Sequence, residues 1–87
     1  MGKGKDIKII WGGRFEKDGR RHGQYQAERR GMTIDQIMAA IKQPNRRIRQ
    51  SNDCQRYCKI FESGEAVIVA VEKDSTTYEV ITCYWRN

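Results

Sequence analysis

The sequence predicts an α+β fold in which two helices near the N-terminus pack on a four-stranded antiparallel β-sheet. Three observations support this prediction. Apolar residues recur at helical spacing before Pro44, the apolar period changes to two after it, and short turn-like connections separate the later segments. Strands joined by such short connections usually pair with their neighbours in sequence, so the sheet should be an antiparallel meander. The 87 residues are sufficient for one small domain.

Both helices are marked by signals at their ends. The first is expected over residues 24–30 and is followed by Gly31, because glycine is the usual residue just past a helix end. The second begins at Thr33, which forms a capping-box pattern with Gln36, and it ends before Pro44. An apolar stripe at helical spacing should face the sheet, and it consists of Ile34, Ile37, Met38 and Ile41.

Four later segments have the composition of strands, and they are residues 46–50, 54–62, 66–71 and 77–85. The third is apolar without a break, which is typical of a strand covered on both faces. The last alternates strongly, and its two faces should carry Tyr78, Val80, Thr82 and Tyr84 on one side and Ile81, Cys83 and Trp85 on the other.

The residues ahead of the helices form a basic region, residues 1–21. Residues 7–11 have β-branched, strand-like content that Gly12 and Gly13 end. Residues 17–19, Lys-Asp-Gly, are a turn signal, so a loop or small hairpin is expected there. The single domain then continues with the helices at 22–43 and the sheet at 46–86.

The charge of the chain is positive and unevenly distributed. Its net charge is +6, from 17 Lys and Arg against 11 Asp and Glu. Residues 1–31 hold nine basic and four acidic side chains, whereas residues 32–87 hold eight and seven. This distribution favours a nucleic acid, an acidic protein or an anionic surface as partner. No apolar stretch approaches the roughly 20 residues of a membrane span, and no signal peptide is evident. A cytoplasmic site of action is expected because the cysteines are expected to be reduced.

The three cysteines are expected to be reduced and buried. Together with His22, residues Cys54, Cys58 and Cys83 have the composition of a Cys3His zinc site. In a strand, however, Cys54 and Cys58 would be separated by about 13 Å, which is too far for one zinc ion. The sequence therefore predicts neither a metal nor a cofactor.

His22 is the only histidine and the strongest candidate for chemistry. Histidine takes and gives protons near neutral pH. It directly follows Arg20 and Arg21, and Arg14 is close in sequence. Cleavage of RNA without a metal requires a base for the 2′-hydroxyl and cations for the charge that develops on the phosphate. His22 and these arginines can supply both, and the hydroxyls of Thr82 and Tyr84 could bind or protonate phosphate oxygens.

Each of these features also has a simpler interpretation. A lone histidine can be a solvated or capping residue, and an arginine-rich strand can protect an exposed sheet edge. Basic residues also favour the C-terminal end of a helix. The candidate RNA contacts are Arg14, Arg29, Arg46, Arg47, Arg49 and Trp85. From the residues alone, a small basic binding domain and a nuclease both remain open.

A resemblance favours the nuclease. The chain carries His22, then Arg30-Gly31-Met32-Thr33, then Ile34, Ile37 and Pro44, an arginine-bearing strand, and a last strand ending in Val80-Ile81-Thr82-Cys83-Tyr84. This series resembles small RelE-like and colicin D-like toxin domains of the barnase–EndoU–colicin–RelE superfamily, over roughly residues 20–86. These domains are metal-independent ribonucleases found in toxin–antitoxin pairs and at the C-termini of polymorphic and contact-dependent toxins.

The resemblance implies a toxin that cleaves tRNA or ribosome-bound mRNA through attack by the 2′-oxygen, giving a 2′,3′-cyclic phosphate. It implies a site formed by His22, Arg20, Arg21, Arg30, Thr82 and Tyr84. Gln26 stands where relatives often carry a second arginine. A cognate antitoxin or immunity protein with an acidic surface is the expected partner, and delivery as part of a larger toxin is compatible with this view. The alternative is a non-catalytic RNA- or protein-binding module, such as a phage or plasmid accessory factor.

Overall fold

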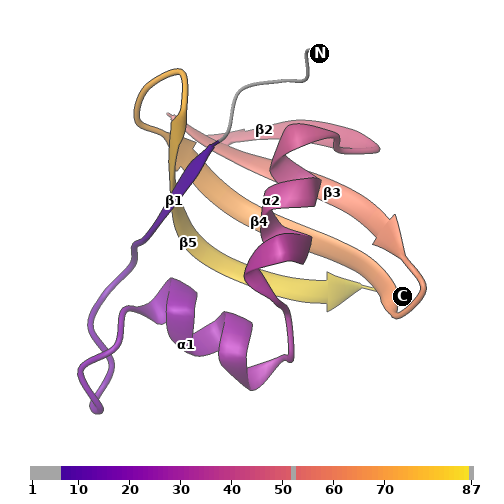
Figure 1. Cartoon of the computed structure of the whole chain (residues 1–87). Coiled ribbons are helices and arrows are strands. Elements are labelled where there is room, and N and C mark those ends of the chain that lie inside the picture. Colours follow the sequence, from indigo (N-terminus) through magenta and orange to yellow (C-terminus); the bar gives the residue numbers. More distant parts are fainter. Residues whose placement is uncertain (1–6, 52, 87) are drawn as a thin grey trace.

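The computed structural model describes residues 7–51 and 53–86. The elements follow one another as β1 (Lys8–Trp11), α1 (His22–Arg29), α2 (Ile34–Lys42), β2 (Arg46–Ser51), β3 (Cys54–Phe61), β4 (Gly64–Glu72) and β5 (Thr77–Arg86) (Figure 1). The predicted α+β class is confirmed. No helix in the described part of the chain is long and apolar enough to cross a membrane.

The sheet has five strands and is mixed, so the prediction of four antiparallel strands is corrected. Its strand order is β1-β5-β4-β3-β2. The strands β2 to β5 form the expected antiparallel meander. In addition, β1 pairs in parallel with β5, with Lys8 opposite Thr77 and Trp11 opposite Val80. This pairing joins the two ends of the chain, and no local turn signal can indicate it.

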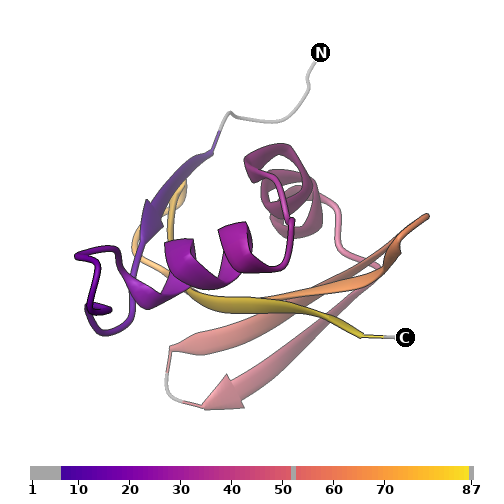
Figure 2. The same ribbon diagram turned by 90° about the horizontal axis from the view of Figure 1, so that it is seen from below.

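Both helices lie on one face of the twisted sheet, and the other face carries no helix (Figure 2). The second helix begins as predicted, because the Thr33 hydroxyl accepts from the Gln36 backbone N–H and the Gln36 side chain accepts from the Thr33 N–H. The core between helices and sheet consists of Ala27, Met32, Ile37, Ala40, Ile41, Tyr57, Ala66, Ile68, Ala70, Val80 and Cys83. Burial of each large apolar side chain here contributes about 1.5–3 kcal/mol.

The last strand contains a β-bulge, so the residues after it lie on the opposite face from the one predicted relative to Val80. Val69 lies opposite Thr82 whereas the next residue, Ala70, lies opposite Val80, so Ile81 is the extra residue of β5. A bulge inserts one residue into the alternation of side chains. Val80 therefore faces the helices, together with Cys83. Thr82 and Tyr84 pair with Val69 and Val67 on the helix-free face, not on the face of Val80 as predicted.

A short hairpin connects β1 to α1. Phe15 and Arg21 pair in an antiparallel bridge, the Glu16 N–H donates to the Arg20 carbonyl oxygen at 2.7 Å, and Gly19 has a φ of 92°. Such a positive φ is the reason that glycine occupies this turn position. The expected small hairpin is thus present. The first six residues of the predicted basic region lie outside the described residues.

Candidate active site

The N-terminus of α1 is held against β1, the hairpin and β5 by close backbone contacts. The His22 N–H donates to the Arg14 carbonyl oxygen at 2.8 Å, and the Gly23 N–H donates to that of Gly12 at 3.0 Å. Gly12 in turn donates to the Val80 carbonyl oxygen at 2.8 Å. The bulged part of β5 therefore fixes where α1 begins. It also fixes the position of His22, which is the first residue of the helix.

The His22 ring lies within hydrogen-bond distance of a carboxylate that the sequence did not indicate. Its Nδ1 lies 2.7 Å from Glu16 Oε2, and the two side chains are 25% and 20% exposed. When Nδ1 carries a proton and donates it to the carboxylate, Nε2 retains its lone pair and can act as a base. The hairpin explains the contact: Phe15 and Arg21 share one of its faces, so Arg14, Glu16, Arg20 and His22 share the other.

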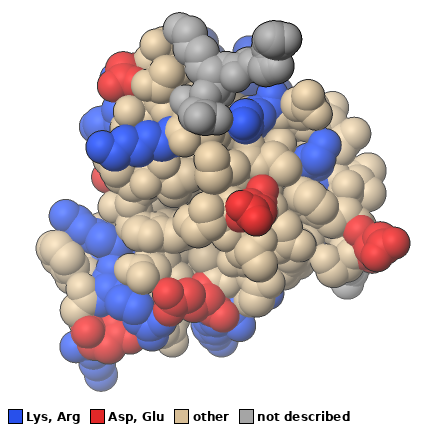
Figure 3. All heavy atoms as spheres, in the orientation of Figure 1, with Lys and Arg blue, Asp and Glu red and all other residues tan. Residues whose placement is uncertain are grey.

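A shallow hollow of about 230 Å³ lies beside this pair. It is lined by Glu16, Lys17, Asp18 and Tyr25. Tyr25 stands three residues after His22 on α1 and therefore projects from the same side of the helix. Figure 3 shows that Lys and Arg side chains gather around the hairpin and α1, with several carboxylates among them. Glu16 both contacts His22 and lines this hollow, so it connects the histidine to the concave surface.

The arginines of the hairpin differ in how their charge is compensated. Arg20 donates to Asp18 and Glu28, and its guanidinium lies 5.2 Å from the centre of the Tyr25 ring. Hydrogen bonding to Arg20 lowers the pKa of the Asp18 carboxyl below its usual value. Arg20 therefore links the hairpin to α1 and has no spare charge for a phosphate.

Arg14 and Arg21 remain available to a ligand. Arg14 is 80% exposed, and its Nε lies 3.8 Å from Glu16 Oε2, which is too long for a hydrogen bond. Arg21 donates to the Gly13 carbonyl oxygen at 2.9 Å and stacks on the ring of Phe15 at 3.8 Å. No carboxylate of the described residues pairs with Arg21.

The structure does not bring Arg30 to His22. Arg30 follows the last residue of α1 and His22 is its first, so about 12 Å of helix separates the two. Gln26, at the position of the second family arginine, is buried and accepts a hydrogen bond from Arg30 Nε at 2.9 Å. Arg29 is exposed in the last turn of the same helix.

The remaining predicted site residues lie elsewhere. Thr82 and Tyr84 occupy the helix-free face of the sheet. Trp85 donates its Nε1–H to the Arg30 carbonyl oxygen at 2.9 Å and packs edge-on against Phe61, so its ring is part of the structural framework. The three arginines of β2 lie on the sheet edge opposite β1, and they are Arg46, Arg47 and Arg49.

The cysteines occupy separate positions in the sheet. Cys58 and Cys83 are buried and Cys54 is half-buried, and all three are free thiols. Burial raises the pKa of the Cys83 thiol to about 11. Within residues 7–51 and 53–86, no three His, Cys, Asp or Glu side chains are placed to hold one metal ion.

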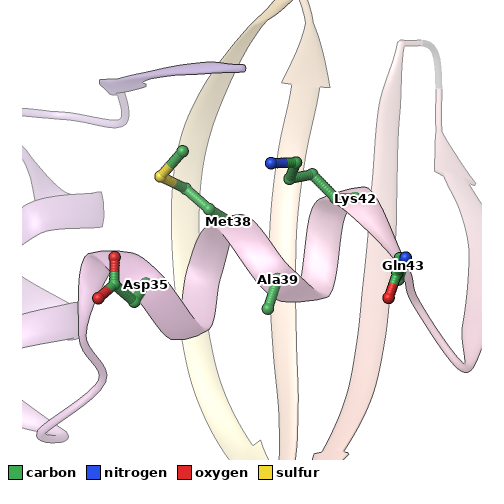
Figure 4. A pocket seen from close by; sticks show the side chains of 5 residues that line it. All are labelled: Asp35, Met38, Ala39, Lys42 and Gln43. Atoms are coloured by element: carbon green, nitrogen blue, oxygen red, sulfur yellow. The ribbon is translucent and has the colours of Figure 1, made fainter. Parts of the chain in front are cut away.

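A larger hollow of about 400 Å³ lies on α2, and few of the side chains that line it are chemically reactive. It is lined by Asp35, Met38, Ala39, Lys42 and Gln43, from α2 and the residue that follows it (Figure 4). Its charged groups are one carboxylate and one ammonium group. Its volume exceeds that of the hollow beside His22, but no lining residue comes from α1 or the hairpin.

The fold and the site together define a small basic α+β domain with a histidine–carboxylate pair at the start of its first helix. Comparison of the chain with protein-family models, curated proteins and solved structures finds no match.

Proposed function

We propose that this domain is a metal-independent RNA endonuclease that acts as a toxin, with His22 as the general base. The observation that carries the proposal is the 2.7 Å contact between His22 Nδ1 and Glu16 Oε2. A carboxylate at one ring nitrogen fixes the orientation and the tautomer of the imidazole, and leaves the other nitrogen to accept a proton. The resemblance of the sequence to RelE-like and colicin D-like domains supports the same reaction class.

In the proposed reaction, His22 Nε2 takes the proton of an RNA 2′-hydroxyl. The 2′-oxygen then forms a bond to the adjacent phosphorus, and the bond from phosphorus to the 5′-oxygen breaks. The 5′-oxygen leaves as a hydroxyl after it gains a proton, which imidazolium or water can supply. The products are a 2′,3′-cyclic phosphate and a free 5′-hydroxyl, so the RNA loses one proton and gains one.

Cations must compensate the charge that develops on the phosphate. Among the candidates, Arg14 lies directly opposite His22 in the hairpin, and Lys17 lines the hollow. Arg21 pairs with no carboxylate of the described residues, but its guanidinium lies over Phe15 on the other face of the hairpin. We therefore assign phosphate binding at the cleaved bond to Arg14 and Lys17, and assign Arg20 to support of the hairpin.

The substrate class in this proposal is RNA, either tRNA or ribosome-bound mRNA. A cell that makes such a toxin requires an inhibitor, so the proposed protein partner is a cognate antitoxin or immunity protein with an acidic surface. The net charge of +6 supports a partner of opposite charge.

The test is expression of the parent chain and of His22→Ala in a bacterial host, with total RNA followed on a denaturing gel. The parent should stop growth and yield discrete fragments, and purified protein should yield the same fragments in EDTA. His22→Ala should reduce the cleavage rate by about 10²–10⁴-fold, the usual contribution of general-base catalysis. Ser63→Ala, an exposed change in the turn between β3 and β4, is the matched control and should behave as the parent. Intact RNA with the parent chain contradicts the proposal.

A non-catalytic RNA- or protein-binding module is the second candidate, and the helix-free sheet face favours it. This face carries Thr82 and Tyr84 together with Arg46 and Arg86, which both pair with Glu65. A binding module would tolerate His22→Ala and would bind RNA with a steep dependence on salt concentration. The cleavage assay therefore separates the two candidates.

A further inference from the structure

The hairpin before α1 presents an exposed aromatic ring whose position requires explanation. Phe15 is 64% exposed, and the other large exposed apolar side chains of the described residues, Ile34 and Ile60, lie on different elements. A phenylalanine ring exposed at this hairpin is not part of the hydrophobic core. The ring instead supports the guanidinium of Arg21, which lies 3.8 Å from the ring centre.

The stack of Phe15 and Arg21 is held in place before any ligand binds. The two residues are directly opposite each other in the antiparallel bridge. Arg21 is also anchored, because its side chain donates to the Gly13 carbonyl oxygen at 2.9 Å. The guanidinium of Arg21 lies over one side of the Phe15 ring, and both residues remain exposed. A preformed surface of this kind costs little entropy when a flat ligand stacks on it.

The stack is directly attached to the candidate active site. Arg21 is followed by His22, and Phe15 by Glu16, so each member of the stack adjoins a member of the histidine–carboxylate pair. Because side chains alternate along the hairpin, the stack lies on the face opposite this pair. An RNA strand that passes over the edge of the hairpin would place one nucleotide at His22 on one face and a base farther along the strand on the stack of the other face.

We propose that Phe15 and Arg21 form a binding site for one unpaired nucleobase of the cleaved RNA strand, close to the cleaved bond. The inference deepens the proposed ribonuclease function and rests on it for the position of the cleaved bond. Aromatic rings and arginine planes are the usual stacking surfaces for unpaired RNA bases, and a base held in a duplex cannot reach them. The site thus selects single-stranded segments of RNA, such as loops.

The local charge favours RNA over an acidic protein segment. Between residues 14 and 30 there are six Lys and Arg and three Asp and Glu side chains. Asp18 and Glu28 pair with Arg20, and Glu16 contacts His22 with Arg14 3.8 Å away, so the remaining cations of this segment exceed its carboxylates and favour the phosphates of RNA. A flat stack offers surface to a base, whereas a protein anchor requires a pocket that surrounds it.

Binding can be measured without cleavage in the His22→Ala background. The probes are a fluorescein-labelled ten-nucleotide oligouridine, a probe of equal length with abasic positions, and a blunt RNA duplex. Phe15→Leu keeps an apolar side chain but removes the ring, and should weaken oligouridine binding at least about fivefold. Its affinity for the duplex and for the abasic probe should stay within about twofold of the parent. Ile60→Leu, at another exposed apolar position, is the matched control and should change none of the three affinities.

A second variant reports stacking directly. Phe15→Trp should retain the affinity for oligouridine, and its additional tryptophan fluorescence should be quenched by oligouridine but not by the abasic probe. Equal binding of oligouridine by Phe15→Leu and the parent overturns the proposal. The proposal is also overturned if polyglutamate displaces oligouridine from the parent chain but not from Phe15→Leu. That result would assign the surface to an acidic protein.

The outcomes also separate this inference from the proposed function. A parent chain that cleaves no RNA but binds oligouridine through Phe15 keeps the base site and overturns the nuclease. A chain that cleaves RNA through His22, but whose Phe15→Leu variant binds and cleaves as the parent does, keeps the nuclease and overturns the base site.

Discussion

Gly23 of α1 lies so close to Val80 of β5 that a methyl group at position 23 would be 2.1 Å from the Val80 carbonyl oxygen. This carbonyl belongs to the bulged part of β5 and accepts from the Gly12 N–H. The contact of Gly23 with Val80 therefore sets how closely the first turn of α1 approaches the sheet. Since His22 is the preceding residue, the same contact positions the candidate base.

Gly23→Ala should destabilise the protein even though alanine has the higher helix propensity. Propensity alone would stabilise the helix by about 1 kcal/mol. The added methyl group cannot be accommodated without a shift of α1 away from β5, because the atom it meets is backbone. Overpacking of this kind costs typically 1–3 kcal/mol beyond any gain. Urea unfolding should show a lower free energy of unfolding, and an unchanged or higher value would contradict the close packing.

Arg29→Ala provides the comparison for this measurement. Arg29 is an exposed residue in the last turn of the same helix. Its replacement should change the free energy of unfolding by no more than about 0.5 kcal/mol. Loss of stability at both positions to the same degree would indicate a general effect of substitution in α1.

Local patterns account for the elements that the sequence predicts correctly. The capping box at Thr33, the glycine after Arg30 and the turn at residues 17–19 all act between residues close in the chain. The parallel pairing of β1 with β5 and the bulge at Ile81 do not. Both depend on contacts between distant segments. The alternation of side chains in the sequence cannot reveal the bulge, because β5 alternates strongly on either side of it.

The same limit applies to the site. His22 and the nearby arginines could be identified from residue type and spacing. Glu16 could have been found only by pairing the hairpin in its correct register, with Phe15 opposite Arg21. The bulge also places Thr82 and Tyr84 on the helix-free face of the sheet. The length of α1 separates Arg30 from His22. Sequence order alone could not place these residues on different surfaces.

Glu65 should make stability depend on pH in the acidic range. Hydrogen bonding to Arg86, together with Arg46, lowers the pKa of its carboxyl below the usual value. A lowered folded-state pKa contributes stability that is fully present above the unfolded value, near 4.5, and is lost as the pH falls through the folded value. In thermal melts, Glu65→Gln should therefore be less stable than the parent at pH 7. The difference in melting temperature should disappear as the pH falls toward 3. A constant difference between pH 7 and pH 3 would contradict this role.

The thiols should differ sharply in reactivity. Burial raises the pKa of Cys83 to about 11, so only about a thousandth of this thiol is ionised at pH 8. Cys58 is also buried, whereas Cys54 is half-buried. A thiol-specific reagent at pH 8 should label one cysteine per chain rapidly in the folded protein and all three in urea. Cys54→Ser should remove the rapid phase, and its persistence in that variant would show that Cys58 or Cys83 is accessible.

Glu16→Gln should lower kcat for RNA cleavage by at least about tenfold while KM changes less than about twofold. The amide keeps the size of the side chain but can offer its N–H to Nδ1, which favours the tautomer with the proton on Nε2 and so removes the base. Glu16 contacts the imidazole and not the RNA in this arrangement, so substrate affinity should persist. Unfolding measured in parallel should show that Glu16→Gln is folded at the assay temperature. A fall in affinity with kcat unchanged would instead assign Glu16 to RNA binding and would remove the orienting role of the 2.7 Å contact.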